Sequence, residues 1–191
     1  EIHAVHSEDL LYFAMECLEG RSVRDALRQD PDGVDCENVL RVVADCMAHC
    51  HQQGILHRDL KSDNVFLLAD GRVKLIDFGV ARAVGGTQLT ATGEMVGTLG
   101  YLAPELFGGG QPGPQTDVFA FGVMAFEMYA GRMPFAHPLS AGPVDPPPRM
   151  PAHVAAVMMR CLARDPAERY TDFLQVLRDL PAPDGPEFLE I

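Results

Sequence analysis

The sequence predicts one domain of the α+β class that is mainly helical. Several segments place apolar residues at three- and four-residue steps, which is the spacing of a helix with a buried face. Segments with strand character are short and lie in the N-terminal half of the chain. The length of 191 residues is that of a single domain with a sizeable core.

Strands and helices are both expected at the start of the chain. Residues 2–5 and 10–15 are predicted as two short strands joined by a polar turn. A short helix is expected at 22–29. Asp35 suits the N-cap of a longer helix, which Gly54 ends. The apolar face of this longer helix consists of Cys36, Val39, Leu40, Val43, Met47 and Cys50.

A hairpin and three more helices are expected further along. Residues 65–68 and 73–76 flank an Asp-Gly pair, which favours a tight turn between two strands. Residues 117–130 are apolar on nearly every side and predict a buried helix. Amphipathic helices are expected at 154–162 and 173–180.

Two segments are predicted to lack long regular elements. Residues 80–100 are rich in Gly and Thr and resemble a long loop, a feature that in compact domains is usually functional or disordered. Residues 136–151 contain six prolines and cannot hold a long helix.

The composition disfavours two classes of partner. The formal net charge of −12 argues against nucleic acid, which binds basic surfaces, and against an anionic membrane surface. The longest apolar stretch, 118–130, contains Glu127 and is too short to span a bilayer. Five cysteines without a CxxC spacing fit a reducing compartment, so a cytoplasmic location is expected.

The motif with the most chemical content is HRDLKSDN at 57–64, followed thirteen residues after Asn64 by DFG at 77–79. The carboxylate of Asp59 can orient a hydroxyl nucleophile and accept its proton, and Lys61 can neutralise a transferring phosphate. Asn64 and Asp77 are oxygen ligands of the kind that Mg²⁺ prefers. Because the predicted hairpin between these two ligands brings both of them to one end of a small sheet, the four groups are expected to converge. Their combination predicts phosphoryl transfer from ATP.

Three other groups have simpler explanations than a catalytic or metal site. Cys46 and Cys50, with His49 beside them, could suggest a metal site, but both thiols continue the apolar face of their helix. A buried, hydrogen-bonded role explains His51 better than catalysis. The glycines at 108–110 lack the strand and the GK[ST] sequence of a phosphate loop, so a flexible loop is expected there.

With these motifs, the chain resembles the eukaryotic-type serine/threonine protein kinase family in its bacterial form. The resemblance runs over about 2–180 and includes GTLGYLAPE at 97–105, DVFAFG at 117–122 and RDP at 164–166, which leads to Arg169. Lysine at position 61 is typical of serine/threonine kinases rather than tyrosine kinases.

The resemblance implies a kinase-like C-lobe with a small β-hairpin and two residual N-lobe strands. The N-lobe strands and the start of the hinge fall in 1–16, the C-lobe in 17–182 and a tail in 183–191. The implied functional segments are the catalytic loop 57–64, the DFG motif 77–79 and the activation segment 77–105.

The resemblance also implies a role for individual residues in catalysis and in binding Mg²⁺ and ATP. The implied catalytic residues are the base Asp59, the γ-phosphate contact Lys61, the Mg²⁺ ligands Asn64 and Asp77, and Thr98, which braces Asp59 and Lys61. The implied adenosine contacts are the gatekeeper Met15, the hinge residues Glu16 and Leu18, the ribose neighbour Ser22 and the adenine floor Phe66.

Regulatory and structural roles follow in the same way. Arg58 is the expected partner of an activation-loop phosphate, for which Thr90 and Thr92 are the candidates; the alternative is that both threonines are ordinary solvated loop residues. The implied structural residues are Glu105 and Arg169, as a buried ion pair, and Asp117, as the acceptor for the backbone of the 57–58 turn or as an N-cap of the apolar helix.

The chain departs from the family pattern in two places. No glycine-rich loop and no nucleotide-binding strand lysine precede residue 2, so a fragment is expected whose parent protein supplies the missing N-lobe and whose isolated form is inactive. The sheet edges that this truncation exposes invite association. The proline-rich stretch 137–151 also leaves little room for the helix that docks substrates in the family.

Three functions are compatible with these features. The first is a kinase that uses Mg-ATP to phosphorylate serine and threonine in protein substrates. The second is a non-catalytic, kinase-like scaffold, which has no physical need for four converging polar groups. The third, a small-molecule phosphotransferase, is disfavoured because such enzymes usually lack the segment found at 97–105.

Overall fold

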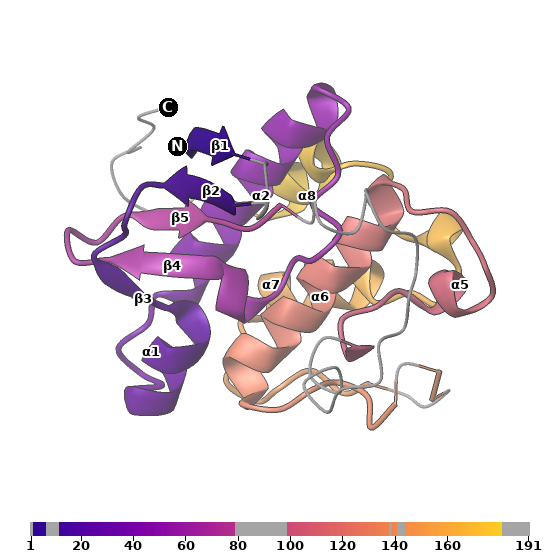
Figure 1. The fold of residues 1–191 in the computed structure, drawn as a ribbon. Coiled ribbons are helices and arrows are strands. Elements are labelled where there is room, and N and C mark those ends of the chain that lie inside the picture. The colour runs from indigo at the N-terminus through magenta and orange to yellow at the C-terminus, as the bar shows by residue number, and fades with distance from the viewer. Residues whose placement is uncertain (1, 7–11, 79–98, 138, 141–143, 181–191) are drawn as a thin grey trace.

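The computed structural model of the chain describes residues 2–6, 12–78, 99–137, 139–140 and 144–180. Helices are the main regular elements of this part of the chain, and two small antiparallel sheets lie at one side of them (Figure 1). The predicted class, α+β and mainly helical, is therefore confirmed.

The strands form two separate antiparallel sheets. In the first, β1 (Ile2–His6) pairs with β2 (Tyr12–Met15). The second has the order β3-β4-β5 and consists of β3 (Gly20–Ser22), β4 (Val65–Leu68) and β5 (Val73–Leu75). The two strands expected at the start of the chain and the hairpin at 65–76 are thus present.

Strand β3 is absent from the sequence prediction. Its three residues carry no alternation of apolar and polar side chains, so only the pairing with β4 makes them a strand. Gly20 lies so close to β4 that a Cβ atom there would be 2.3 Å from the carbonyl oxygen of Leu67. This close approach explains why glycine occupies the start of the strand.

The first of the two helices that follow begins one residue after its predicted start at Ser22, which is its N-cap, and the second begins at the predicted cap Asp35. The Ser22 side chain accepts a hydrogen bond from the Asp25 backbone at the start of α1 (Val23–Gln29). Asp35 accepts one from Asn38 at the start of α2 (Cys36–Gln52). The apolar residues of α2 at three- and four-residue spacing are mostly buried, as the sequence predicts.

Helix α6 (Pro114–Ala130) begins three residues before its predicted start at 117. Proline is favoured in the first turn because it needs no hydrogen-bond partner there, and the hydroxyl of Thr116 donates to the Gly113 carbonyl at 2.6 Å. Asp117 therefore lies inside the first turn, and the reading of Asp117 as the N-cap is wrong. A one-turn helix, α5 (Pro104–Phe107), precedes α6.

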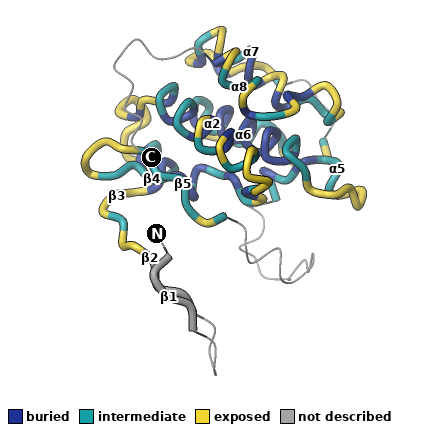
Figure 2. The backbone as a smooth tube through the Cα atoms, turned by 90° about the horizontal axis from the view of Figure 1, so that it is seen from above, coloured by how far each residue is buried: buried dark blue, intermediate teal, exposed yellow. Residues whose placement is uncertain are grey.

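The core lies where α6 meets α2, α7 (Ala152–Cys161) and α8 (Phe173–Asp179), as the dark blue segments of Figure 2 show. Gly122 permits the contact with α7, because a Cβ atom there would be 2.7 Å from Cys161 Cβ. Two 3-10 helices, η1 (Ser62–Asn64) and η2 (Pro166–Glu168), complete the described elements. No helix of the described part of the chain is both long and apolar enough to cross a bilayer.

Candidate active site

The turn that begins the predicted catalytic loop is bound to the core through Asp117 of α6. Its buried carboxylate accepts hydrogen bonds from the backbone N–H groups of His57 and Arg58, each at 2.9 Å. The same carboxylate lies 3.0 Å from Nε2 of His51, at the end of α2. These contacts hold the backbone of Arg58 in the left-handed region, at a φ of 64°. Residues other than glycine are strained in this conformation. The start of the loop is therefore held in one position against α6.

His57 joins the catalytic loop to the residues around Asp77. Its Nδ1 accepts a hydrogen bond from the Asp59 backbone at 3.3 Å, so its Nε2 carries the proton and donates to the Ile76 carbonyl at 3.1 Å. Burial lowers the pKa of the His57 imidazole, although the carboxylate of Asp117 opposes this shift. The neutral ring also packs against Phe78, with 4.6 Å between ring centroids.

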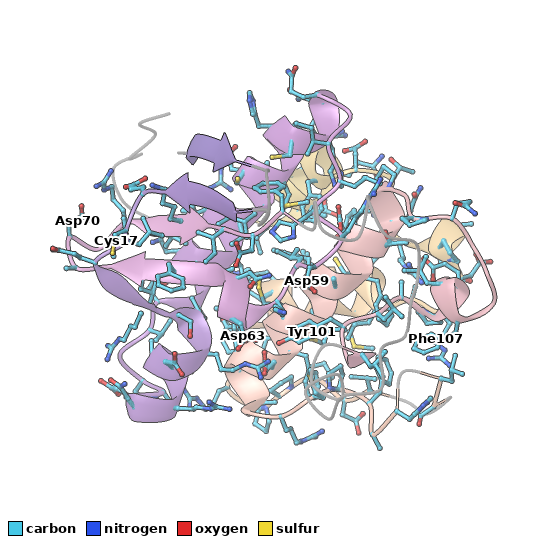
Figure 3. All side chains as sticks on the ribbon, in the orientation of Figure 1. Cys17, Asp59, Asp63, Asp70, Tyr101 and Phe107 are labelled. Carbon is cyan, nitrogen blue, oxygen red and sulfur yellow. The ribbon has the colours of Figure 1, made fainter. Side chains whose placement is uncertain are left out.

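Asp59, Lys61 and Asn64 are in direct contact. The Lys61 ammonium is 2.9 Å from Oδ2 of Asp59. The amide nitrogen of Asn64 donates to the same oxygen at 3.1 Å and to the Asp59 carbonyl at 2.8 Å. The side chains of Asp59 and Lys61 are 20% and 19% exposed, so both can still be reached from solvent. Figure 3 shows Asp59 in the middle of the molecule, between the sheet and α6.

Asp77 is held beside this group by its neighbours in the sequence. The Ile76 backbone donates to the Asn64 carbonyl at 2.9 Å, and Phe78 packs against His57. Asp77 itself is exposed and has a φ of 55°. A second strained non-glycine residue in the same region indicates that the surrounding contacts, rather than local preference, set the direction of the backbone.

The donor atoms of this region fit a magnesium ion. Because the amide nitrogen of Asn64 donates to Asp59, its Oδ1 could serve as a metal ligand, and the exposed carboxylate of Asp77 could supply another. No group of three or more His, Cys, Asp or Glu side chains suited to a metal ion occurs in the described part of the chain. A site with few protein ligands is typical of Mg²⁺ bound together with phosphates.

The group of cysteines and histidines on α2 provides no alternative centre. All five cysteines are free, and burial raises the pKa of the Cys46 thiol to about 12. Burial raises the pKa of Cys50 as well. These thiols therefore remain protonated at neutral pH, whereas a metal ligand or nucleophile must be a thiolate. This supports the structural interpretation of both residues.

The residues expected at the adenosine end lie on the three-stranded sheet and on the segment leading to it. Ser22 is opposite Phe66 in the β3-β4 register. The Ser22 hydroxyl donates to the Asp25 carboxylate at 2.8 Å, so it already serves the start of α1. Glu16 forms an ion pair with Lys74 of β5, while Leu18 is half-buried. Of Met15, only the backbone in β2 is described.

Three of the predicted residues lie outside the described part of the chain. These are Thr98, expected to brace the catalytic loop, and the candidate phosphorylation sites Thr90 and Thr92. Arg58, their expected partner, is exposed on the surface.

The expected structural pair of Glu105 and Arg169 is present. The two guanidinium nitrogens Nη1 and Nη2 donate to the two carboxylate oxygens at 2.8 and 2.9 Å. Arg169 also donates to the carbonyls of Ala163, Gln115 and Arg164, and its side chain is 0% exposed. This pair ties the end of the predicted activation segment to the helices that carry the core.

The sequence analysis missed a second polar group beside the catalytic loop. Its members are Arg24, Ser62, Asp63, Tyr101 and Glu127. The signal that could have indicated it is Glu127, the one charged residue within the apolar stretch 118–130. A carboxylate in a buried helix needs partners, and the structure provides three.

Comparisons with known proteins agree with this geometry. Residues 2–180 match the family described as "Protein kinase domain". The sequence is 35% identical to the serine/threonine-protein kinase PknL of Mycobacterium tuberculosis over 191 residues, covering 90% of this chain and 46% of that protein. It is 33% identical to the serine/threonine-protein kinase drp72 of Corynebacterium efficiens, covering 90% of this chain and 35% of that protein. The chain thus spans less than half the length of these relatives.

A solved structure shows the same architecture. The crystal structure of the PknI kinase domain from Mycobacterium tuberculosis matches with a TM-score of 0.73 at 25% sequence identity. The match covers 94% of this chain and 69% of that chain.

Proposed function

The chain belongs to the bacterial-type serine/threonine protein kinase family, and from that premise we propose that it carries the catalytic loop for phosphorylating proteins with Mg-ATP. The γ-phosphate would go to serine and threonine hydroxyls of protein substrates. The observation that carries this proposal is the pair of contacts made by Oδ2 of Asp59, to Lys61 at 2.9 Å and to Asn64 at 3.1 Å. A base, a cation and an oxygen ligand within one hydrogen-bonded group suit phosphoryl transfer.

Each residue has a distinct part in the proposed reaction. Asp59 orients the substrate hydroxyl and accepts its proton as the new O–P bond forms and the bond to the leaving ADP breaks. Lys61 neutralises negative charge on the transferring group. Asn64 fixes the Asp59 carboxylate through its amide nitrogen. Asn64 and Asp77 would hold Mg²⁺, whose chemistry is to neutralise the phosphate charge when bound with ATP.

The remaining assignments are part of the same proposal. Glu16, Leu18, Phe66 and Ser22 would lie along the adenosine. Arg58 would bind a phosphate on Thr90 or Thr92, which would link phosphorylation of the 79–98 segment to the catalytic loop that begins at the same turn.

The 191 residues alone are expected to transfer phosphate very slowly or not at all. They hold no glycine-rich loop and no strand lysine ahead of β1, and phosphoryl transfer depends on positioning and neutralising the phosphates. Radiolabelled ATP and a mixture of protein substrates measure this directly, with the longest form of the protein that its gene encodes assayed in parallel. Robust turnover by the isolated chain would contradict the expectation. Stabilisation by Mg-ATP without turnover in the longest form would instead favour a scaffold.

A further inference from the structure

Five polar side chains from separate parts of the chain meet beside η1. Arg24 of α1 lies 3.1 Å from Asp63, 3.2 Å from the Ser62 hydroxyl and 2.8 Å from the Tyr101 hydroxyl. Its guanidinium is also 2.9 Å from Oε1 of Glu127 in α6. Figure 3 labels Asp63 and Tyr101 below Asp59.

Glu127 is the common acceptor of this group. Its Oε1 forms an ion pair with Arg24, while its Oε2 accepts hydrogen bonds from the Ser62 hydroxyl at 2.6 Å and from the Tyr101 hydroxyl. The Glu127 side chain is 16% exposed and Ser62 is fully buried, so water can replace little of this bonding. Burial raises the pKa of the Tyr101 phenol, and the Glu127 carboxylate raises it further, so the phenol stays protonated and donates.

Helix α6 contacts the catalytic loop through two carboxylates, Asp117 and Glu127. Asp117, in the first turn, holds the start of the catalytic loop at His57 and Arg58. Glu127 lies ten residues later, about 15 Å along the helix, and holds the second half of the loop at Ser62. Asp59, Lys61 and Asn64 lie between these two points or directly beside them. One rigid helix thus fixes the loop that carries the reacting groups at its start and at Ser62.

We propose that Glu127, together with Arg24, is a positioning residue for phosphoryl transfer. This inference rests on the function proposed above. Glu127 holds Lys61 and Asn64 in register with Asp59 through Ser62, and it ties Tyr101, just after the 79–98 segment, to the same point. It touches no reacting atom, so its effect is on turnover rather than on nucleotide binding.

The isosteric variant Glu127→Gln is the sharpest test, because glutamine offers one acceptor oxygen to three donors and directs an N–H₂ group at the others. In the longest encoded form of the protein, kcat should fall by roughly 10- to 100-fold, the loss that a displacement of about 1 Å can cause. The KM for ATP should stay within about twofold, since the proposed adenosine contacts are untouched.

A double variant separates positioning from stability. In Glu127→Gln, the charge of Arg24 loses a buried partner, so the temperature of unfolding should fall. Arg24→Met combined with Glu127→Met removes both charges, and apolar replacement of a buried pair often restores stability. The unfolding temperature should recover while kcat stays low, because Ser62 and Tyr101 still lack their acceptor. Glu37→Gln, which alters an exposed pair between α2 and His153, is the matched control.

Amide hydrogen exchange on the 191-residue chain tests whether Glu127 holds the catalytic loop without relying on kinase activity. In Glu127→Gln, amide exchange should rise in 57–64 and 99–103 and stay unchanged in α8. Recovery of kcat together with the unfolding temperature in the double variant would show a merely structural role and overturn the proposal, as would unchanged exchange in 57–64. If the wild-type protein shows no kinase activity, the proposed function fails, and the exchange result alone decides whether Glu127 positions the loop.

Discussion

Replacing Asp59 by asparagine is expected to lower kcat by about 10²- to 10⁴-fold, the contribution of a general base in proton transfer. Asparagine has almost the same shape but cannot accept the proton of the substrate hydroxyl. The hydrogen bond from Asn64 to the backbone carbonyl at position 59, at 2.8 Å, does not depend on the side chain and should persist. The loop should therefore keep its conformation while phosphoryl transfer slows by that factor.

Steady-state kinetics and nucleotide titration on the longest encoded form of the protein test this expectation. The affinity for Mg-ATP should change by less than about threefold, because Asp59 is not among the proposed metal ligands. Asp70→Asn provides the control, since it removes a carboxylate of the same size from the exposed turn between β4 and β5. If Asp59→Asn retained the activity of the Asp70→Asn control, Asp59 could not be the base.

The largest effect on stability is expected at Arg169. Replacement by methionine leaves the Glu105 carboxylate and three backbone carbonyls without their donors. Breaking a buried ion pair by removing one partner costs about 3–5 kcal/mol, a large share of the stability of a small domain. Lysine at this position keeps the charge but not the two-pronged geometry, so Arg169→Lys should also destabilise, by a smaller amount.

Chemical denaturation of the 191-residue chain measures both changes. Arg28→Met is the matched control, because Arg28 forms an exposed pair with Asp25 at 3.8 Å, and such surface pairs contribute about 0–1 kcal/mol. A free energy of unfolding for Arg169→Met that equals the value for Arg28→Met would show that the buried pair does not hold the activation segment to the core.

The elements whose signals are local could be predicted from the sequence. Asp35 as a cap and the apolar face that follows define α2, and the Asp-Gly turn defines the β4-β5 hairpin. In each case the determining residues are neighbours in the chain. The spacing of the HRDLKSDN and DFG motifs likewise indicated which side chains would meet, and the contacts of Asp59 with Lys61 and Asn64 are present.

Features that depend on distant partners could not be predicted in this way. Strand β3 exists because Gly20 can approach β4 closely, and nothing in its own three residues predicts a strand. The start of α6 depends on Pro114 and on the bond between Thr116 and Gly113, whereas the apolar pattern begins only at 118. The contact of Arg24 with Glu127 joins α1 to α6, and no spacing rule relates those two positions.

The central claim is that Asp59, Lys61, Asn64 and Asp77 act around one metal-bound triphosphate. A crystal structure of the longest encoded form with Mn²⁺ and a non-hydrolysable ATP analogue tests it most directly, because anomalous scattering locates the metal. We predict a metal ion about 2.0–2.2 Å from side-chain oxygens of Asn64 and Asp77, with the γ-phosphate beside Lys61 and Asp59. A metal and triphosphate bound elsewhere, with these four side chains facing no nucleotide, would contradict the claim.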